Sequence, residues 1–524
     1  MNRLPVPELG TTTVPATPAS PDLKMPAGAE NIRFVLEGIQ LNGITAYPSE
    51  EFKPLYKDLE GKKVSLSDIY QVAAAITQRY RHDGYVLSRA IIPAQQIKNG
   101  IITITVVEGS VGEVHTQGHY SATNVTQGII SRIQSMHPLN ARVLEREVLL
   151  LNDLGGVNVR AVLEPVSTGD AAPGTVAIRL VFEEKPGSYS ATIDNYGSRY
   201  LGPVEGTVNL SKGNLLLPYD LLTIAGIGSL PFSELRYISG QYIMPLAAEG
   251  LSLALSGGHG TADPAYRLES FNIHNVSTDA GASLFWKPIR QREENLTFGG
   301  GFAVKNVRSN ILGSPFYDDN IRELKASAVY NRSDSWHGNN MLDTEIVQGL
   351  DLLGASHPGS PNISRAEGKT EFTKLDITAN RLQDLTHSFQ GYIAFHGQVT
   401  NNPLLSSEEF GYGGQSFGRA YDPSEIIGDD GIAGSVELRY NGIPAAIGIV
   451  TQPFVFYDVG KVWNIDTAGG SMSGASAGVG LRFATDYHVS GTFTAAQPLT
   501  RDVTANSPRT GHNPRLFFSI TGQF

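Results

Sequence analysis

The chain has 524 residues, enough for roughly two to four domains, and only 17% of them are charged, against about 25% in soluble proteins. Its net charge of −11 argues against nucleic acid as a partner, because phosphate binding needs a basic surface. The chain has no cysteine, which excludes disulfide bonds and thiolate metal sites.

The low charge is not accompanied by a membrane helix. The longest apolar segment, residues 215–230, is interrupted by Pro218 and Asp220, whereas a membrane helix needs about 20 nearly unbroken apolar residues. Glycine accounts for 57 of the 524 residues, and there are 21 tyrosines and 21 phenylalanines. These features are typical of a transmembrane β-barrel, in which alternation spreads the apolar residues along the sequence.

Residues 1–30 are predicted to form a proline-rich lead that cannot bury a core. Met1, Asn2 and Arg3 run into polar sequence without the apolar stretch of a signal peptide. We therefore expect that this chain lacks the signal peptide that an exported protein would carry. The prolines of the lead are Pro5, Pro7, Pro15, Pro18, Pro21 and Pro26.

Residues 31–109 predict a small α+β module that begins with a strand at 32–39. A helix is expected at 65–84, because its apolar residues recur on one face and Gly84 stands where a C-cap glycine belongs. Strands at 85–93 and 100–109 close the module. The apolar face of the helix comprises Ile69, Val72, Ala73, Ile76 and Tyr80.

Residues 110–186 repeat this order as a second module of similar length. The repeat predicts two α+β domains, each with two helices packed on a three-stranded sheet. The elements expected in the second module are a strand at 111–118, helices at 121–133 and 141–153, and strands at 157–165 and 174–184.

Residues 187–524 lose the helical period, and segments of about ten residues alternate apolar with small or polar side chains. The second face is mostly glycine and serine, which favours a wet lumen over the alternative of a soluble sandwich. The 338 residues (524 − 186) allow sixteen antiparallel strands of roughly 21 residues each. The expected fold class is therefore mixed, with two α+β domains before a 16-stranded transmembrane barrel. The side chains expected to face lipid include Leu251, Phe298, Phe302, Leu481 and Phe518.

The last residues, 515–524, read RLFFSITGQF and alternate as a final strand. Leu516, Phe518, Ile520 and the terminal Phe524 share one face. Outer-membrane barrels of Gram-negative bacteria commonly end in such a strand with a C-terminal aromatic residue. We therefore expect Phe518 and Phe524 to act as a signal to the barrel-assembly machinery.

Two motifs stand near the C-terminus. The first is Gly418-Arg419-Ala420-Tyr421, and the second is Phe456-Tyr457-Asp458-Val459-Gly460. Together with two α+β modules before a barrel of this size, they resemble the two-partner secretion transporters (the TpsB family), whose modules are called POTRA domains. The resemblance covers residues 31 to the end and implies domains at 31–109, 110–186 and 187–524.

The resemblance implies that the first motif lies in a loop that folds back into the lumen. A guanidinium in that position is partly desolvated and needs a planar acceptor, so we expect Arg419 to contact the Asp458 carboxylate. Tyr421 is expected to complete this latch, and the alternative is a solvated loop arginine. Ala420 replaces the usual motif glycine and disfavours positive φ, so either the loop tip has a different backbone conformation or the sequence belongs to a divergent branch of the family. The supporting motif residues are Gly418, Ala420, Phe456 and Gly460.

Other patterns predict no catalytic, metal or cofactor site. Residues 474–478 match G-x-S-x-G, but they lie in an alternating strand rather than at a strand-to-helix turn. His115 and His119 straddle a strand end, so their spacing does not suit a metal. The acidic pairs at 293–294 and 429–430 are expected to be solvated loop charges, since no EF-hand spacing surrounds them. No nucleotide-binding fingerprint is present.

The resemblance implies an outer-membrane pore of a Gram-negative bacterium, with its POTRA domains in the periplasm. We expect a monomer that captures one secreted β-helical exoprotein by β-augmentation and exports it unfolded without ATP. The alternatives are a barrel-assembly insertase, which usually has more POTRA domains, and a diffusion porin, which has none. A barrel enzyme would need a catalytic cluster at its rim, and none is evident.

Overall fold

The computed structural model describes residues 25–166, 172–230, 232–360, 362–443, 448–465, 470–504 and 512–524. Most of the predicted lead, residues 1–24, lies outside the described residues. The described chain divides into two compact units, one ending at Lys185 and one running from Pro186 to Phe524. Among the described residues, no helix is both long and apolar enough to cross a membrane.

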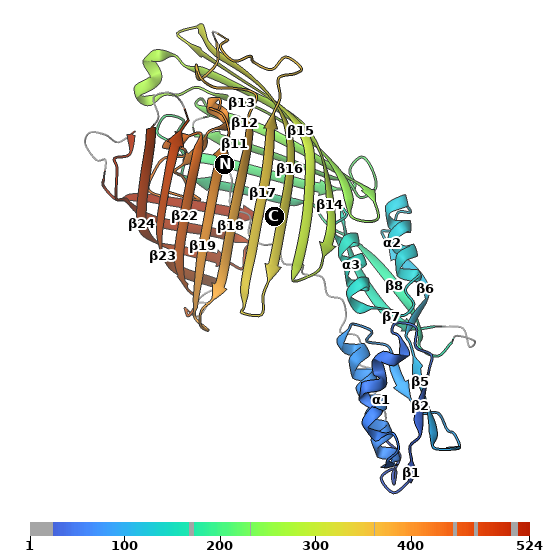
Figure 1. Cartoon of the computed structure of the whole chain (residues 1–524). Coiled ribbons are helices and arrows are strands. Elements are labelled where there is room, and N and C mark those ends of the chain that lie inside the picture. Colours follow the sequence, from blue (N-terminus) through green and yellow to red (C-terminus); the bar gives the residue numbers. More distant parts are fainter. Residues whose placement is uncertain are drawn as a thin grey trace. The chain divides into compact units, whose positions relative to one another are not determined.

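The first unit begins with a small α+β module whose helix α1 packs on a three-stranded sheet of order β2-β5-β4 (Figure 1). The buried helix positions are the five predicted ones, and they pack against Ile102, Ile104 and Val106 of β5. Strands β1 and β3 form a separate two-stranded sheet. The elements are β1 (Arg33–Val35), β2 (Gly38–Asn42), η1 (Ser49–Leu55), η2 (Lys57–Leu59), β3 (Lys63–Ser65), α1 (Leu66–His82), β4 (Arg89–Ile91) and β5 (Ile101–Val107).

Local sequence sets both ends of α1. The Ser65 side chain accepts a hydrogen bond from the Asp68 N–H, and the Asp68 carboxylate accepts one from the Ser65 N–H, which forms a capping box. At the other end, Gly84 has φ +94°, so the chain leaves the helix at the predicted glycine.

The prediction of two helices in the first module was wrong. Only α1 is an α-helix there, and two 3-10 turns, η1 and η2, occupy the segment before β3. Pro48 precedes η1 and Pro54 lies inside it, and proline cannot donate the backbone hydrogen bond that an α-helix requires. The predicted strand at 32–39 is also divided into β1 and β2.

The second module confirms the predicted two helices and three strands. Its sheet has the order β6-β8-β7, with β6 and β8 parallel, and α2 and α3 lie beside it (Figure 1). Thr123 caps α2 through a capping box with Thr126, and the Asn140 side chain caps α3. The elements are β6 (Ser110–Gly118), α2 (Asn124–Gln134), α3 (Ala141–Asn152), β7 (Val157–Pro165) and β8 (Thr175–Glu184).

A nearly buried carboxylate, Glu108, ties the first module together. Its oxygens accept hydrogen bonds from the Thr45 N–H (2.8 Å), the Ala46 N–H (3.0 Å) and the Tyr80 hydroxyl (2.6 Å). Burial alone would raise the pKa of Glu108, but these hydrogen bonds outweigh it and lower the pKa below its ordinary value. The ionised carboxylate therefore joins the 43–47 turn to α1.

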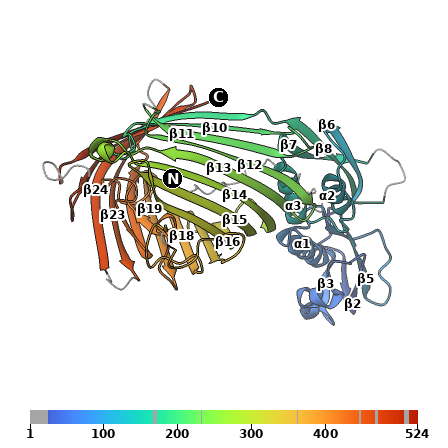
Figure 2. The same cartoon turned by 90° about the horizontal axis from the view of Figure 1, so that it is seen from above.

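The second unit is a closed barrel of sixteen antiparallel strands (Figures 1 and 2), as predicted. Each strand pairs with its neighbour in sequence, apart from the short hairpin β20–β21, and β26 pairs with β9 to close the ring. The strands are β9 (Ser188–Asp194), β10 (Glu205–Gly213), β11 (Leu221–Ser229), β12 (Leu235–Ala247), β13 (Leu251–Ala262), β14 (His274–Arg290), β15 (Glu294–Ile311), β16 (Ser314–Ser333), β17 (Gly338–Gly349), β18 (Thr373–Asp384), β19 (Phe389–Thr400), β22 (Asp430–Tyr440), β23 (Ile449–Asn464), β24 (Gly470–Thr485), β25 (Val489–Pro498) and β26 (Arg515–Gln523). A 3-10 turn, η3 (Tyr266–Phe271), lies between β13 and β14.

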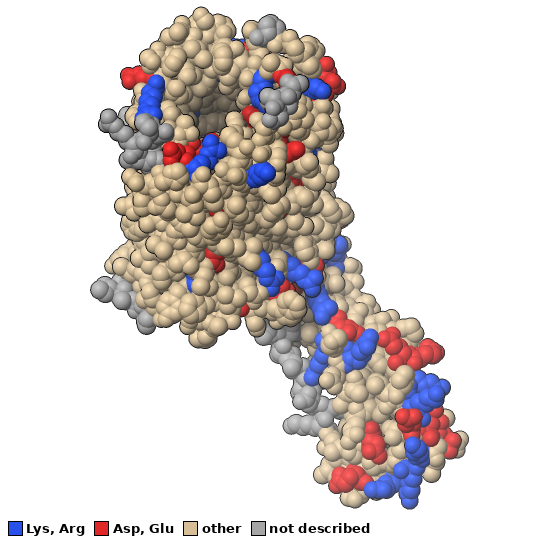
Figure 3. All heavy atoms as spheres, turned by 60° about the vertical axis from the view of Figure 1, so that its left-hand side comes forward, with Lys and Arg blue, Asp and Glu red and all other residues tan. Residues whose placement is uncertain are grey.

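The register places the predicted apolar face on the outside of the barrel. Phe298 pairs with Trp286, and both are more than 40% exposed. The same alternation puts the other four predicted side chains outward, since Leu251 pairs with Trp286, Phe302 with Leu324, Leu481 with Phe493, and Phe493 with Phe518. Figure 3 shows a broad band of this outer surface with almost no charged residue.

The two rims of the barrel differ. Strands β24 and β25 are joined by residues 486–488, and β18 and β19 by 385–388, at the rim where β9 begins. We call this the short-turn rim. The opposite, long-loop rim carries the connections 350–372 and 401–429.

Replacing Glu108 with glutamine removes the charge that four hydrogen bonds recognise, and should cost about 1–3 kcal/mol of local stability. In the wild-type chain the carboxylate's contribution is present above the unfolded pKa of about 4.3 and is lost as the pH falls through the lowered folded pKa. Amide hydrogen exchange at Thr45 and Ala46, corrected for intrinsic rates, measures both effects. Unchanged protection in Glu108→Gln, matching the exposed control Glu113→Gln, would contradict this role.

Candidate functional site

The loop between β19 and β22, residues 401–429, lies inside the barrel. It contains η4 (Ser406–Glu408) and the hairpin of β20 (Phe410–Tyr412) with β21 (Ile426–Gly428). Its aromatic side chains are buried against wall residues that the register turns inward, Ala394, Ala433 and Val462. The loop therefore has a core of its own within the lumen. The buried loop residues are Phe410, Tyr412, Phe417, Tyr421 and Ile426.

Arg419 is the most heavily bonded side chain of this loop, and it contacts Asp458 as predicted. Its Nε donates to Asp458 Oδ2 (3.0 Å) and its Nη2 to Oδ1 (2.8 Å), which is the bidentate geometry of a strong pair. The Arg419 backbone N–H also donates to Asp458 Oδ2 (3.0 Å). Arg419 is 7% exposed and Asp458 is 0% exposed, so the alternative of a solvated loop arginine is excluded by this geometry.

Further wall groups complete the surroundings of the guanidinium. Nη1 donates to Glu437 Oε2 (2.7 Å) and Nη2 to Ser435 Oγ (2.9 Å), while Ser435 Oγ donates to Asp458 Oδ1 (2.8 Å). The Phe456 ring lies 3.6 Å from the guanidinium carbon, a close cation–π contact. Four hydrogen bonds and a ring face thus replace the water that the cation lost on burial.

The sequence patterns did not identify Glu437, which is shared by three arginines. Besides Arg419, it accepts hydrogen bonds from Arg439 Nε (2.6 Å) and lies 2.7 Å from Arg482 Nη1. Arg439 and Arg482 also lie over the rings of Tyr392 and Phe454. Val436 and Leu438 face outward on β22, so the residues that alternate with them, Glu437 and Arg439, face the lumen. This alternation was the sequence signal that could have found Glu437 and Arg439.

Tyr421 lies in the same cluster, but it is not bonded to Asp458. Its hydroxyl donates to the Ala475 carbonyl oxygen on β24 (3.0 Å), and its ring packs near Tyr412. It therefore joins the loop to a third strand of the wall, after β22 and β23.

Ala420 does not have the positive φ of a motif glycine, so of the two alternatives the structure does not support a distorted loop tip. The left-handed position is Gly418, with φ +74°, and Ala420 is not among the residues with positive φ. Its methyl group is fully buried among Phe454, Phe456 and Phe517. An alanine therefore fits here because the backbone strain falls two residues earlier.

Gly460 has a steric role in this arrangement. A Cβ at Gly460 would lie 2.2 Å from the Tyr412 ring, and one at Gly474 on the next strand would lie 2.7 Å from the same ring. Two facing glycines thus form the recess in the wall that accepts Tyr412.

Further ion pairs attach the loop at other points. Glu408 binds Lys305 (2.9 Å) and Lys374 (2.8 Å), which project inward from β15 and β18. On the other side, Arg515 of β26 binds Asp422 (2.6 Å) and donates to the Ala420 carbonyl oxygen (2.9 Å). The loop is therefore tied to opposite parts of the wall.

The expectation that residues 429–430 are solvated loop charges was wrong. Asp429 is completely buried, pairs with Arg365 and accepts hydrogen bonds from the Leu404 and Ile465 N–H groups. Asp430 is the first residue of β22, and its carboxylate accepts from the Thr400 N–H. Glu294 begins β15 and accepts from the Tyr330 hydroxyl.

The remaining motifs show no reactive arrangement. The G-x-S-x-G residues lie within β24, and Ser476 Oγ lies 3.4 Å from Asp458 Oδ2 rather than beside a histidine. His115 pairs with Arg179 in the sheet, and its side chain lies 3.1 Å from the Glu113 carboxylate on the exposed part of β6. In the part of the chain that the structure describes, no group of three or more His, Asp or Glu residues is placed to hold a metal ion.

The family of the chain follows from comparison with known proteins. Residues 175–483 match the family described as "Haemolysin secretion/activation protein ShlB/FhaC/HecB", and residues 34–109 match "POTRA domain, ShlB-type". The chain belongs to this family. The family is the one that the sequence resembled, the two-partner secretion transporters of the outer membrane.

Individual relatives have low sequence identity to this chain but align with most of its length. The heme/hemopexin transporter protein HuxB of Haemophilus influenzae is 24% identical over 448 residues, 82% of this chain and 76% of that protein. The outer membrane transporter CdiB of Escherichia coli is 23% identical over 505 residues, covering 92% and 81%. The solved structure of CdiB from Escherichia coli matches with a TM-score of 0.76 at 19% identity, covering 97% of this chain and 94% of that one, which supports the same fold.

The loop geometry of the transporter predicts a larger loss of stability from a substitution at Gly418 than from one at Ala420. Gly418→Ala forces a left-handed alanine, at about 1–2 kcal/mol, and places its Cβ 2.8 Å from the Tyr412 ring. Ala420→Gly removes one buried methyl group without backbone strain and should cost only about 1 kcal/mol. The temperature at which the detergent-solubilised barrel loses its compact mobility on a gel measures both. A larger loss for Ala420→Gly would contradict the placement of the strain.

Proposed function

We propose that this transporter exports one cognate secreted exoprotein, in an extended state and without a nucleotide, and that the loop 401–429 is the part of the pore that moves. The observation that supports the proposal is the character of the loop's anchors. They are ion pairs to the lumen wall, and released charged groups are readily hydrated in a water-filled pore. Hydration of the released charges thus lowers the cost of moving the loop, whose aromatic side chains also pack against the wall.

The nature of the passenger is proposed from the relatives. HuxB is described as a heme/hemopexin transporter and HpmB of Proteus mirabilis as a hemolysin transporter. By analogy, the partner of this chain is a secreted β-helical exoprotein, and its folding outside the cell supplies the direction of transport. No covalent step is required of the transporter.

We further propose that residues 31–109 and 110–186 are two POTRA domains that face the periplasm. In bacterial outer-membrane barrels the short turns lie on the periplasmic side, and β9 begins at the short-turn rim directly after the second module. Strands β2 and β4 are the edges of one sheet and β6 and β7 the edges of the other, so each offers backbone groups for an added strand of the passenger.

The outer face accounts for the other proposed partners. Its apolar side chains would contact outer-membrane lipid, and the outward Phe518 with the exposed terminal Phe524 would be recognised by the barrel-assembly machinery. The barrel closes on itself through β26 and β9, so a monomer suffices for a complete pore.

Removing either partner of the Arg419–Asp458 pair should loosen the loop. In a dry interior this would cost about 3–5 kcal/mol, and water in the lumen reduces that figure. We expect Arg419→Ala and Asp458→Ala to lower secretion and to raise the frequency of channel opening in planar bilayers. The double variant should be little worse than either single one, because both remove the same interaction.

The matched control is Arg308→Ala, which breaks an exposed pair with Asp318. Surface pairs contribute about 0–1 kcal/mol, so channel opening should not change. Two results together would show that the pair does not hold the loop. The secretion defects of Arg419→Ala and Asp458→Ala would add in the double variant, and the channels of both single variants would open as often as wild-type channels.

Deleting residues 31–109 should abolish secretion and leave a heat-modifiable barrel in the membrane. The barrel unit has its own closed sheet, so it does not need the first module to fold. Secretion at the wild-type rate by this deletion variant would rule out capture by the first module.

A further inference from the structure

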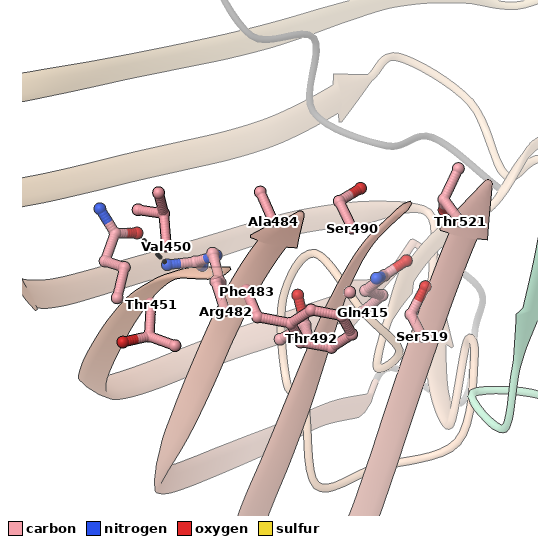
Figure 4. Close-up of a pocket in the computed structure, with 12 residues that line it drawn as sticks. Gln415, Val450, Thr451, Arg482, Phe483, Ala484, Ser490, Thr492, Ser519 and Thr521 are labelled. Carbon is pink, nitrogen blue, oxygen red and sulfur yellow. Dashed lines mark hydrogen bonds between the residues drawn. The ribbon is translucent and has the colours of Figure 1, made fainter. Parts of the chain in front are cut away.

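A cavity of about 440 Å³ lies in the lumen at the short-turn rim, on the wall formed by β23 to β26 (Figure 4). Residues of all four strands line it together with Gln415 of the loop. In register, Ser490 of β25 pairs with Thr521 of β26, and Thr492 pairs with Ser519. Figure 4 shows these four hydroxyl groups on two neighbouring strands, with Gln415 between Thr492 and Ser519.

These side chains offer hydrogen-bonding groups that the protein does not use. Within the described part of the chain, the side chains of Gln415, Ser490, Thr492 and Ser519 have no hydrogen-bond partner. Thr521 pairs only with Thr192 of β9 (2.8 Å). Elsewhere the loop is bound to the wall by ion pairs, by the Tyr421 hydrogen bond and by aromatic packing, whereas Gln415 faces an uncharged patch without such a contact.

The patch suits an uncharged ligand. Arg482 is the one charged residue at the cavity, and it is engaged by Glu437. An anionic or cationic ligand would therefore find no free counter-charge among the residues that line the cavity. In contrast, the wall from β15 to β18 turns Lys305, Glu323, Lys325, Glu345 and Lys374 inward.

The spacing of the patch suits an extended chain. Side chains on one face of a strand repeat every two residues, at about 6.6–6.8 Å, and neighbouring strands lie about 4.8 Å apart. A polypeptide lying extended along β25 and β26 has the same two-residue repeat. Its backbone donors and acceptors therefore meet the hydroxyl groups again after each shift of two residues.

We propose that Gln415, Ser490, Thr492, Ser519 and Thr521 form a binding track for an extended, uncharged segment of polypeptide at the start of its path through the barrel. This rests on the proposed export function and specifies what the lumen contacts. Uncharged hydroxyl groups make individually weak hydrogen bonds, so the track holds a segment while letting it slide. Because Gln415 belongs to the loop, a segment in the track also touches the part of the pore that moves.

The cysteine-free chain permits a direct test. The probe is a 15-residue peptide of Ser, Thr, Asn and Gly with one central cysteine activated as a thiopyridyl mixed disulfide. It is added to detergent-solubilised full-length Ser490→Cys, Thr492→Cys and Ser519→Cys variants. The matched controls are Thr378→Cys, which faces the lumen from β18, and Val479→Cys, which faces outward. Each rate is divided by that of a small thiopyridyl reagent, which corrects for accessibility.

We expect the normalised rate at the track positions to exceed that of Thr378→Cys by about tenfold, because binding raises the local peptide concentration. The same peptide without cysteine should compete, and lysine-rich or glutamate-rich peptides should not. Equal normalised rates at the track and at Thr378→Cys would overturn the proposal. Protection by an uncharged oligosaccharide but not by the peptide would also overturn it, in favour of a glycan site.

A secretion assay separates this proposal from the proposed function. The triple variant Ser490→Ala/Thr492→Val/Ser519→Ala should export the passenger about fivefold more slowly, while the conservative Ser490→Thr/Thr492→Ser should match wild type. If wild type exports nothing, the proposed function fails. The binding track alone is refuted under three joint results: the wild type exports the passenger, the triple variant exports it at the same rate, and the peptide reacts no faster at the track positions than at Thr378→Cys. If the triple variant does not insert, the single-cysteine rates decide.

Discussion

A guanidinium that cannot lose its proton is buried inside the barrel, and much of the surrounding structure follows from that constraint. Arg419 needs acceptors on the wall, so Asp458 and Glu437 must face inward on adjacent strands. That requirement sets the phase of alternation for β22 and β23, and through the register it sets the outward face as well. Gly418 turns the chain so that the side chain can reach these acceptors.

The lumen wall has two chemically distinct sides, and the loop is attached to both. Glu408 binds lysines of β15 and β18, whereas Arg419, Tyr421 and Asp422 are bound on β22 to β26. Release of one side alone leaves the other attached, so a passenger that displaces Arg419 swings the loop rather than expelling it. Ion pairs therefore hold the loop on both sides of the wall, through Glu408 on one side and through Arg419 and Asp422 on the other.

The architecture was largely predictable, because alternation with period two runs along the barrel strands and is interrupted by register shifts in the pairings of β12 with β13, β14 with β15 and β15 with β16. The outward orientation of Leu251, Phe298 and Leu481 follows from the alternation of side chains along each strand, and a register shift of one residue would have turned them into the lumen. The first module was harder, because Pro48 and Pro54 convert a helical-length segment into 3-10 turns. No hydrophobic period marks such a change, and only the prolines signal it.

The site was predicted in part. Arg419 and Asp458 were paired through motif resemblance, but Glu437, Ser435 and Arg482 join them through strand register, which a linear pattern does not contain. Asp429 was assigned to solvent because it lies in a loop between strands. Its burial depends on Arg365, which is 64 residues away in sequence. One alternative for Ala420 was a different backbone conformation, yet the strained position is Gly418, and only φ angles distinguish the two.

The central claim is that the Arg419 cluster holds the loop in the lumen of the resting protein. Amide hydrogen exchange of residues 418–421 in the full-length protein tests it most directly, because the Arg419 N–H donates to Asp458. The account predicts exchange at least about 100-fold slower than in the exposed residues 351–354, in keeping with roughly 3 kcal/mol for a buried pair, and loss of that protection in Asp458→Asn. Exchange at residues 418–421 as fast as at 351–354 would show that the loop is not held, and would contradict the account.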